Sequence, residues 1–163
     1  MLETDGRPDV RIRPLIAADA AVAAAVVRAA FAAQSAATDP PSGALGETTA
    51  SLAGKLAAGG GAGAEVDGRL AGVVLWAETE GGLHVGRLSV LPEWRGQGMA
   101  RALLAACEAE ARARGLSRLT LRARLALAEN QRLFARCGFA PIGQGAHPGY
   151  REPTFVVMEK RLD

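Results

Sequence analysis

The chain has 163 residues, of which 49% are hydrophobic and 22% charged, which predicts one folded domain and excludes a disordered chain. A net charge of only +2 gives no basic footprint for nucleic acid or a membrane surface, so neither partner is expected. The longest apolar stretch, residues 20–27, is too short to cross a bilayer, and residues 1–9 lack the apolar run of a signal peptide. Cys107 and Cys137 show no metal-ligand spacing, so we expect buried thiols, no metal and a cytoplasmic location.

Apolar periodicity and turn residues divide residues 10–163 into alternating strands and helices, after a flexible tail at residues 1–9. In chain order we predict a strand at 10–13, a helix at 20–33 capped by Asp19, a loop at 34–46, a helix at 47–58, strands at 64–66, 70–77 and 83–90, a helix at 98–115, a strand at 117–122, a helix at 128–137, and strands at 139–142 and 154–161. This order predicts a single α/β (α+β) domain, with about four helices flanking a mixed, mostly antiparallel sheet of six to seven strands.

A glycine-rich run at residues 59–63 matches a dinucleotide-binding fingerprint by letter. That fingerprint must follow a strand and open a helix, whereas this run follows a predicted helix and precedes a predicted strand. We therefore predict a turn at this run.

A second glycine-containing segment has the order required of an anion site. Residues 95–100 (Arg-Gly-Gln-Gly-Met-Ala) follow a strand and open a helix whose apolar stripe is Met99, Leu103, Cys107 and Ala111, with Leu104 beside it. A helix N-terminus has unpaired N–H groups and a partial positive charge, and glycines let an anion approach the backbone. The sequence therefore predicts a phosphate cradle, with a loop that needs positive φ at its glycines as the alternative.

The segment from Leu88 to Ala100, Leu-Ser-Val-Leu-Pro-Glu-Trp-Arg-Gly-Gln-Gly-Met-Ala, resembles the acyl-CoA-binding motif of the GCN5-related N-acetyltransferase (GNAT) family. The family pattern Arg/Gln-x-x-Gly-x-Gly/Ala is matched by Arg95, Gly98 and Ala100. Gly138-Phe139 and the closing segment 158–162 are also similar to that family, so the resemblance covers residues 10–162.

The resemblance implies acetyl-CoA as co-substrate, with its pyrophosphate on the backbone N–H groups of residues 97–100. Its pantetheine arm would pair like a strand with residues 88–90, and a backbone N–H near Val90 would face the thioester carbonyl. The cofactor-binding residues expected on this basis are Leu88, Ser89, Val90, Arg95, Gly96, Gln97, Gly98, Met99, Ala100, Arg101, Asn130 and Phe134.

Transfer of an acetyl group to an amine needs a proton acceptor, donors for the oxyanion and sometimes a proton for the thiolate. His84 is the first candidate base because its ordinary pKa suits neutral pH, and Glu78 is a weaker one. A half-buried structural histidine is the alternative interpretation. The family resemblance implies direct attack, and a cysteine nucleophile is the rival route.

The expected acid is missing. Where the family pattern has a tyrosine, counted back from Gly138-Phe139, this chain has Phe134, and Asn130 is shifted by three residues from the usual asparagine. Tyr150, the only tyrosine, and His147 lie in a loop that could overhang the acceptor site, so both are candidates for acceptor binding and Tyr150 for the acid.

Three functions fit these features. The first is an N-acetyltransferase that acts on a primary amine in a ternary complex with acetyl-CoA. The second is a non-catalytic CoA or acyl-CoA sensor, which the missing tyrosine favours. The third is an enzyme that uses a longer acyl-CoA. The sequence does not identify the amine, and a homodimer is possible without an identified interface.

Overall fold

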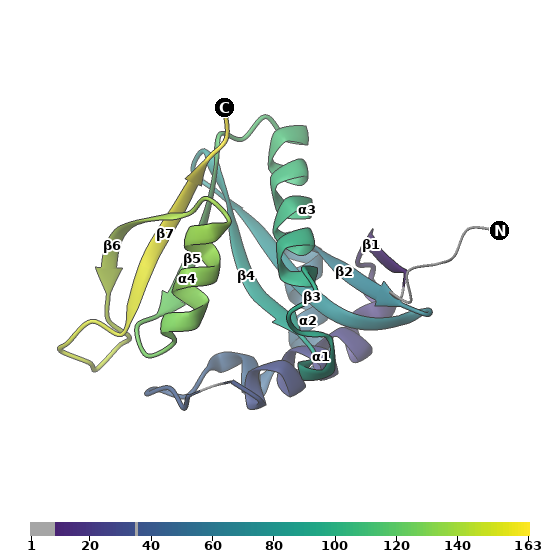
Figure 1. Cartoon of the computed structure of the whole chain (residues 1–163), viewed down its shortest axis with the longest axis horizontal. Helices are drawn as coiled ribbons and strands as arrows, with labels where there is room; N and C mark the ends of the chain where they lie inside the picture. Colours follow the sequence, from purple (N-terminus) through teal and green to yellow (C-terminus); the bar gives the residue numbers. More distant parts are fainter. Residues whose placement is uncertain (1–8, 35) are drawn as a thin grey trace.

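The computed structural model describes residues 9–34 and 36–163, so the tail predicted for residues 1–9 lies outside them except for Asp9. In the described part, seven strands form one sheet in the order β1-β2-β3-β4-β5-β7-β6 (Figure 1). Neighbours are antiparallel except for β4 and β5, which are parallel. The strands are β1 (Val10–Pro14), β2 (Gly60–Val66), β3 (Arg69–Thr79), β4 (Gly82–Val90), β5 (Arg118–Arg124), β6 (Ala140–Gly145) and β7 (Phe155–Arg161). The predicted mixed, mostly antiparallel sheet is confirmed.

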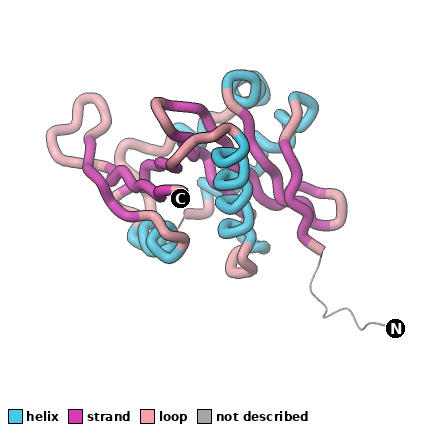
Figure 2. Tube along the Cα trace, turned by 90° about the horizontal axis from the view of Figure 1, so that it is seen from above, coloured by secondary structure: helices cyan, strands magenta, loops and turns pink. Residues whose placement is uncertain are grey.

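Helices cover both faces of this sheet (Figures 1 and 2). They are α1 (Ala20–Ala32), α2 (Thr49–Ala58), α3 (Met99–Ala113) and α4 (Ala128–Arg136). α1 and α2 lie on one face around buried Val27 and Leu52, and α3 and α4 lie on the other around Leu103 and Phe134. No helix in the described ranges is long and apolar enough to cross a membrane.

The apolar stripe predicted for α3 is confirmed, because all five of its residues are buried against the sheet. On the wet side of α3, Glu108–Arg112 and Glu110–Arg114 form ion pairs of 2.9 Å one helical turn apart. The predicted cap at Asp19 is wrong. Its carboxylate accepts from Arg13 and from the N–H of Ile16, so it closes the turn before α1 and leaves the α1 N–H groups uncapped by its side chain.

The turn predicted at residues 59–63 is also wrong, since β2 already begins at Gly60. These glycines are a packing requirement of the strand. A Cβ at Gly61 would lie 2.5 Å from the carbonyl oxygen of Val74, and one at Gly63 would lie 2.6 Å from the Leu70 side chain. The missing side chains let β3 and Leu15 approach the backbone of β2 closely, which apolar periodicity alone does not reveal.

A bulge in β4 shapes the centre of the molecule. The β3 register shifts between Val73–Ser89 and Leu75–Gly86, which leaves an extra residue in β4, and Arg87 there has a φ of +53°. β4 pairs with β5 only at Leu83 and His84, before the bulge, so from the bulge onward the two strands are no longer hydrogen-bonded. The strands then diverge, as Figure 1 shows, so the last residues of β4 have an open edge toward β5.

Candidate functional site

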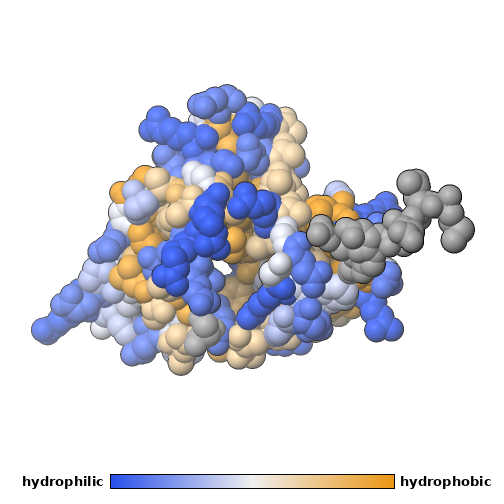
Figure 3. All heavy atoms as spheres, in the orientation of Figure 1, coloured by the Kyte–Doolittle hydropathy of each residue, from blue (hydrophilic) through white to orange (hydrophobic). Residues whose placement is uncertain are grey.

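Two neighbouring cavities lie where β4 and β5 diverge. The first, of about 490 Å³, is enclosed by the last residues of β4, the N-terminal end of α3, the end of α1, and α4. The second, of about 430 Å³, lies between β4, β5, α4 and residues 41–43. In Figure 3 this face of the molecule is hollowed between the two halves of the sheet, with hydrophilic side chains around the opening. Six residues line both cavities, namely Phe31, Gln34, Leu88, Leu127, Asn130 and Phe134.

Free backbone donors lie along the first cavity, which Gly96 and residues 98–101 line. The N–H groups from Gly96 to Arg101 donate to no backbone or side chain of the described residues, and the first helical bond runs from Ala102 N to Gly98 O. Gly98, the residue that precedes α3, has no side-chain cap. Six successive unpaired N–H groups at the positive end of a helix form a binding site for an anion.

The two glycines of this segment have the positive φ of the alternative interpretation, and they also leave the backbone bare as a cradle needs. Gly96 and Gly98 have φ angles of +77° and +81°, in the left-handed region that favours glycine. Both line the first cavity, and a Cβ built on either one meets no protein atom within 4 Å. The positive φ shapes the loop, and the bare backbone leaves its donors accessible.

Arg95 has structural partners that the motif did not reveal. Its Nε donates to the carbonyl of Val90, and its terminal nitrogens donate to those of Ala30 and Ala33, at 2.8–3.2 Å. The side chain therefore ties the C-terminal end of α1 to the end of β4, where a cation also complements the helix dipole. Arg101, on the first turn of α3, lines the same cavity and is exposed.

The open edge of β4 forms the wall between the two cavities. Leu91 N bonds to Ala71 O on β3, and alternate residues of a strand point to opposite neighbours, so the N–H of Val90 points away from β3. The Val90 carbonyl accepts from Arg95, while Ser89 Oγ donates to the carbonyl of Arg87. Val90 therefore has a backbone N–H that is free of β3, and Leu88, Ser89 and Val90 all line the first cavity.

α4 supplies the residues at the junction of the two cavities. Phe134 is 8% exposed and packs edge-to-face on Phe139, with ring centroids 6.1 Å apart. It carries no hydroxyl, so the junction lacks the acid that the family pattern would place there. Asn130, half-buried on the previous turn, lines both cavities, whereas Gln97 lines neither.

The second cavity contains the histidine predicted as base. His84 is half-buried on β4, and its Nδ1 lies 3.3 Å from Thr120 Oγ1 on β5, while its Nε2 has no hydrogen-bond partner within residues 9–34 and 36–163. Burial lowers the pKa of His84 below its usual value of 6.5, and the positive charge of Arg122 lowers it further. The ring is therefore neutral at neutral pH and able to accept a proton.

The other candidates are distributed unevenly. His147 lines the second cavity beside Phe155, and the hydroxyl of exposed Tyr150 donates to Asp39 next to that cavity without lining it. The bond to Asp39 raises the pKa of Tyr150. Glu78 is exposed on β3 and pairs with Leu83, while its neighbour Ala77 pairs with His84, so Glu78 and His84 point to opposite faces of the sheet, and Glu78 lines neither cavity.

Both cysteines lie outside the two cavities. Cys107 is fully buried in the core beneath α3, where burial raises its pKa to about 12, so its thiol stays protonated. Cys137 is buried at the end of α4. Neither geometry supports a cysteine nucleophile. The described residues hold no cluster of three metal-binding side chains.

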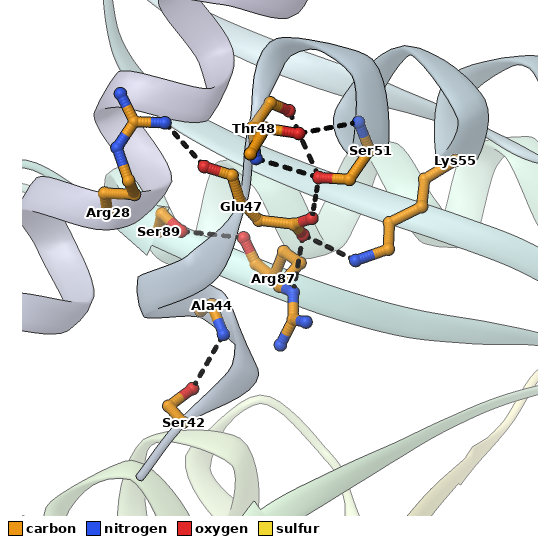
Figure 4. A network of polar contacts seen from close by, with 9 residues as sticks. All are labelled: Arg28, Ser42, Ala44, Glu47, Thr48, Ser51, Lys55, Arg87 and Ser89. Atoms are coloured by element: carbon orange, nitrogen blue, oxygen red, sulfur yellow. Dashed lines mark hydrogen bonds and ion pairs between the residues drawn. The ribbon is translucent and has the colours of Figure 1, made fainter.

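The sequence did not predict a buried carboxylate behind the second cavity. Glu47, with its side chain 2% exposed, accepts from Lys55 Nζ, Ser51 Oγ and Arg87 Nε at 2.6–2.9 Å (Figure 4). Burial alone would raise the pKa of Glu47, but the three donors outweigh it and hold the pKa below its usual value. The network joins α2 to the β4 bulge across 40 residues, and no local pattern signals such a contact.

The fold is that of GNAT acetyltransferases, as comparison with solved structures shows. The PaiA N-acetyltransferase from Thermoplasma acidophilum, in complex with coenzyme A, superposes with a TM-score of 0.80 at 16% identity, over 94% of this chain and 99% of that one. The ribosomal-protein-S18-alanine N-acetyltransferase from Escherichia coli gives 0.76 at 19% identity, over 95% of each chain. YncA from Salmonella typhimurium, a putative acetyltransferase with its cofactor acetyl-CoA, gives 0.70 at 21%, also over 95% of each.

The sequence leads to the same family. Residues 30–139 match the profile of the Acetyltransferase (GNAT) family, which is more than half of the chain. The protein therefore belongs to the GNAT acetyltransferase family, as its resemblance at residues 88–100 predicts. No curated protein sequence matches the chain.

Proposed function

We propose that the protein transfers an acetyl group from acetyl-CoA to a primary amine, by direct attack in a ternary complex. The observation that carries this proposal is the set of N–H groups at Gly96 and Gly98–Arg101, which have no hydrogen-bond partner among the described residues and belong to residues that line the first cavity; that cavity shares Leu88 and Phe134 with the cavity that His84 lines. The coenzyme A and acetyl-CoA complexes of the similar PaiA and YncA structures support the same ligand here.

The residues of the first cavity fit this co-substrate. The cradle at Gly96–Arg101 suits the pyrophosphate, with Arg101 as the accessible cation beside it. The open β4 edge at residues 88–90 offers strand-like hydrogen bonds to an amide-containing arm, as an exposed sheet edge does for a peptide. When bound, acetyl-CoA supplies an activated acetyl thioester at the junction of the cavities.

The second cavity holds the amine beside His84. The neutral ring accepts a proton from the amine at Nε2, because Thr120 occupies Nδ1. The new carbon–nitrogen bond forms as the carbon–sulfur bond breaks, and the sulfur leaves with the electron pair. The N–H of Val90 is the backbone donor for the carbonyl oxygen, where negative charge develops.

The leaving thiolate receives no proton from Phe134, so solvent protonates it in this proposal. A sensor would keep the cradle without needing a place for an amine, and the missing tyrosine favours that alternative. The second cavity of about 430 Å³, open beside His84, supports the enzyme. Whether the acyl chain is longer than acetyl depends on the space beside Val90 and Phe134.

The test is CoA release from acetyl-CoA in the presence of a panel of primary amines, for wild type, His84→Ala and His147→Ala. The chain has two histidines, both on the second cavity, so each variant controls for the other. We expect His84→Ala to lower kcat by about 10²–10⁴-fold, and His147→Ala to leave kcat within about tenfold. Acetyl-CoA binding without release of CoA for any amine would support the sensor instead.

A further inference from the structure

The lining of the second cavity is strongly basic. Arg87, Arg122 and Arg124 line it together with His84 and His147, and no aspartate or glutamate of the described residues does. This contrasts with the chain as a whole, where 19 basic side chains nearly balance 17 acidic ones. Three of the arginines therefore gather at the place where the acceptor amine has to bind.

Arg87 is held in position and keeps its binding groups free. Its Nε donates to Glu47, while its two terminal nitrogens have no hydrogen-bond partner among the described residues. Figure 4 shows these nitrogens directed away from Glu47. A Cβ at Gly43 would lie only 3.1 Å from one of them, so the guanidinium passes closely over a bare backbone. A fixed guanidinium with free N–H groups is the preferred partner of a carboxylate or phosphonate.

The nearby acidic groups offset this surface only in part. Glu47 is shared between Lys55 and Arg87, and the charge of Asp39 acts on Arg124, but neither carboxylate lines the cavity. Arg124 is half-buried and anchored on the carbonyl of Pro40 through one terminal nitrogen.

On the β5 side of the cavity, Arg122 lies over the face of Phe155, 4.6 Å from its centroid, and forms no ion pair with the described residues. Its guanidinium charge is therefore available to a ligand. Arg87 and Arg122 approach the cavity from the two diverging strands, β4 and β5.

We infer that the acceptor is an amine that also carries an oxyanion, a carboxylate or a phosphonate, which binds the terminal nitrogens of Arg87 with the help of Arg122. This inference rests on the proposed function and narrows its substrate class. A polyamine or another polycation is excluded as acceptor by repulsion from the three arginines. The same charges favour the neutral form of the amine, which is the form that attacks.

The probe is a set of four compounds that all carry the leucine side chain, and they are assayed by CoA release at saturating acetyl-CoA. They are leucine, leucinamide, 3-methylbutylamine and the 1-aminoalkylphosphonate analogue of leucine. Leucinamide has a more acidic ammonium group than leucine and offers more neutral amine at a given pH, so a preference for leucine reports recognition of the anion. We expect kcat/KM for leucine or the phosphonate to exceed that of both neutral analogues by at least about tenfold.

Arg122→Gln is the matched variant, because this exposed side chain forms no ion pair in the part of the chain that the structure describes. We expect it to lower kcat/KM for the anionic acceptors by about tenfold and to leave that of 3-methylbutylamine unchanged or raised. Arg87→Lys is a second variant, which keeps the positive charge but loses the two terminal N–H groups of the guanidinium that can bind one oxyanion together. Arg69→Gln, exposed at the start of β3 and away from both cavities, is the control.

A preference for leucinamide or 3-methylbutylamine overturns the inference, as does an Arg122→Gln effect equal for charged and neutral acceptors. If acetyl-CoA binds and neither leucine nor the phosphonate is acetylated, the inference fails while the cradle stands. If acetyl-CoA itself does not bind, the proposed function fails first, so the two failures are distinguishable.

Discussion

The two cavities are built in opposite ways. The first is made of backbone, a row of N–H groups from one continuous segment, Gly96–Arg101, beside the free edge of one strand. The second is made of side chains, and its three arginines and two histidines come from β4, β5 and the loop that precedes β7. A backbone site needs a particular local conformation, whereas a side-chain site needs distant segments to be held in register.

The difference has a consequence for specificity. Bare backbone at a helix N-terminus recognises an anion whatever its neighbours, so the first cavity suits a shared co-substrate. The second cavity depends on positions such as Arg87 and Arg122, which can change without disturbing the cradle. The comparison therefore predicts that substitutions separate co-substrate binding from acceptor selection.

Glu47→Gln should lower stability the most among the proposed variants and should affect the second cavity without affecting the first. The substitution leaves Lys55 and Arg87, whose side chains are 43% and 28% exposed, without their carboxylate, so we expect a loss of about 2 kcal/mol in the free energy of unfolding. The KM of an anionic acceptor should rise and the Kd of acetyl-CoA should not change. Denaturant unfolding and titration calorimetry measure these quantities.

Glu65→Gln is the control for that variant, because Glu65 pairs with a partly exposed Arg13 that also pairs with Asp19. We expect it to cost less than about 1 kcal/mol. Equal weakening of acetyl-CoA and acceptor by Glu47→Gln would show that the cavities are not separable.

Arg95→Gln and Arg101→Gln should show that Arg95 contributes to stability and Arg101 to acetyl-CoA binding. Arg95→Gln removes the bonds to Ala30 and Ala33, so we expect a loss of about 1–2 kcal/mol in unfolding free energy. Arg101→Gln should leave stability within about 0.5 kcal/mol and weaken acetyl-CoA binding, more so at low salt. If Arg101→Gln destabilises the protein and Arg95→Gln does not, these roles are wrong.

The acid limb of the pH profile should report His84. Because its pKa lies below the usual 6.5, the ring stays neutral until the pH falls through that lowered value, and kcat/KM should drop there as the base becomes protonated. Arg122→Gln removes a charge that lowers this pKa, so the inflection should move to higher pH. Arg69→Gln should leave it in place. An inflection that moves down in Arg122→Gln would contradict the role of His84.

Phe134→Tyr should have the smallest effect, as it restores a hydroxyl where the family pattern has one. The added oxygen faces the junction of the two cavities, so we expect an increase in kcat of a few-fold, below about tenfold, if protonation of the thiolate slows turnover. Single-turnover measurement of CoA release tests this. A decrease in kcat with normal stability would show that Phe134 is required as an apolar wall.

The same contrast explains how much of the molecule could be predicted from its sequence. The α3 stripe and the bare backbone before α3 were predictable because both are encoded within about one helix length, by apolar spacing and by glycines before a helix. The glycines of β2 were misassigned because their reason is the close approach of β3, a tertiary contact. The partners of Arg95 lie more than 60 residues away in the sequence, at Ala30 and Ala33.

The arginines of the second cavity illustrate the same limit. The strand predicted at 117–122 includes Arg122 but ends before Arg124, whereas β5 extends to Arg124 and places both arginines on one face of the strand. Nothing local indicated that Arg87, from the bulge of another strand, would join them, because that depends on how β4 leaves β5.

The most direct test of the central claim is calorimetric titration of acetyl-CoA into Gly98→Trp and Gly115→Trp. The two glycines flank the two ends of α3, have φ angles of +81° and +72°, and have open space around a built Cβ, so both variants carry similar backbone strain. Only Gly98 lines the first cavity. We predict that Gly115→Trp binds like wild type and that Gly98→Trp weakens the Kd by at least about 100-fold. Equal affinities for the two variants would contradict the cradle and the function built on it.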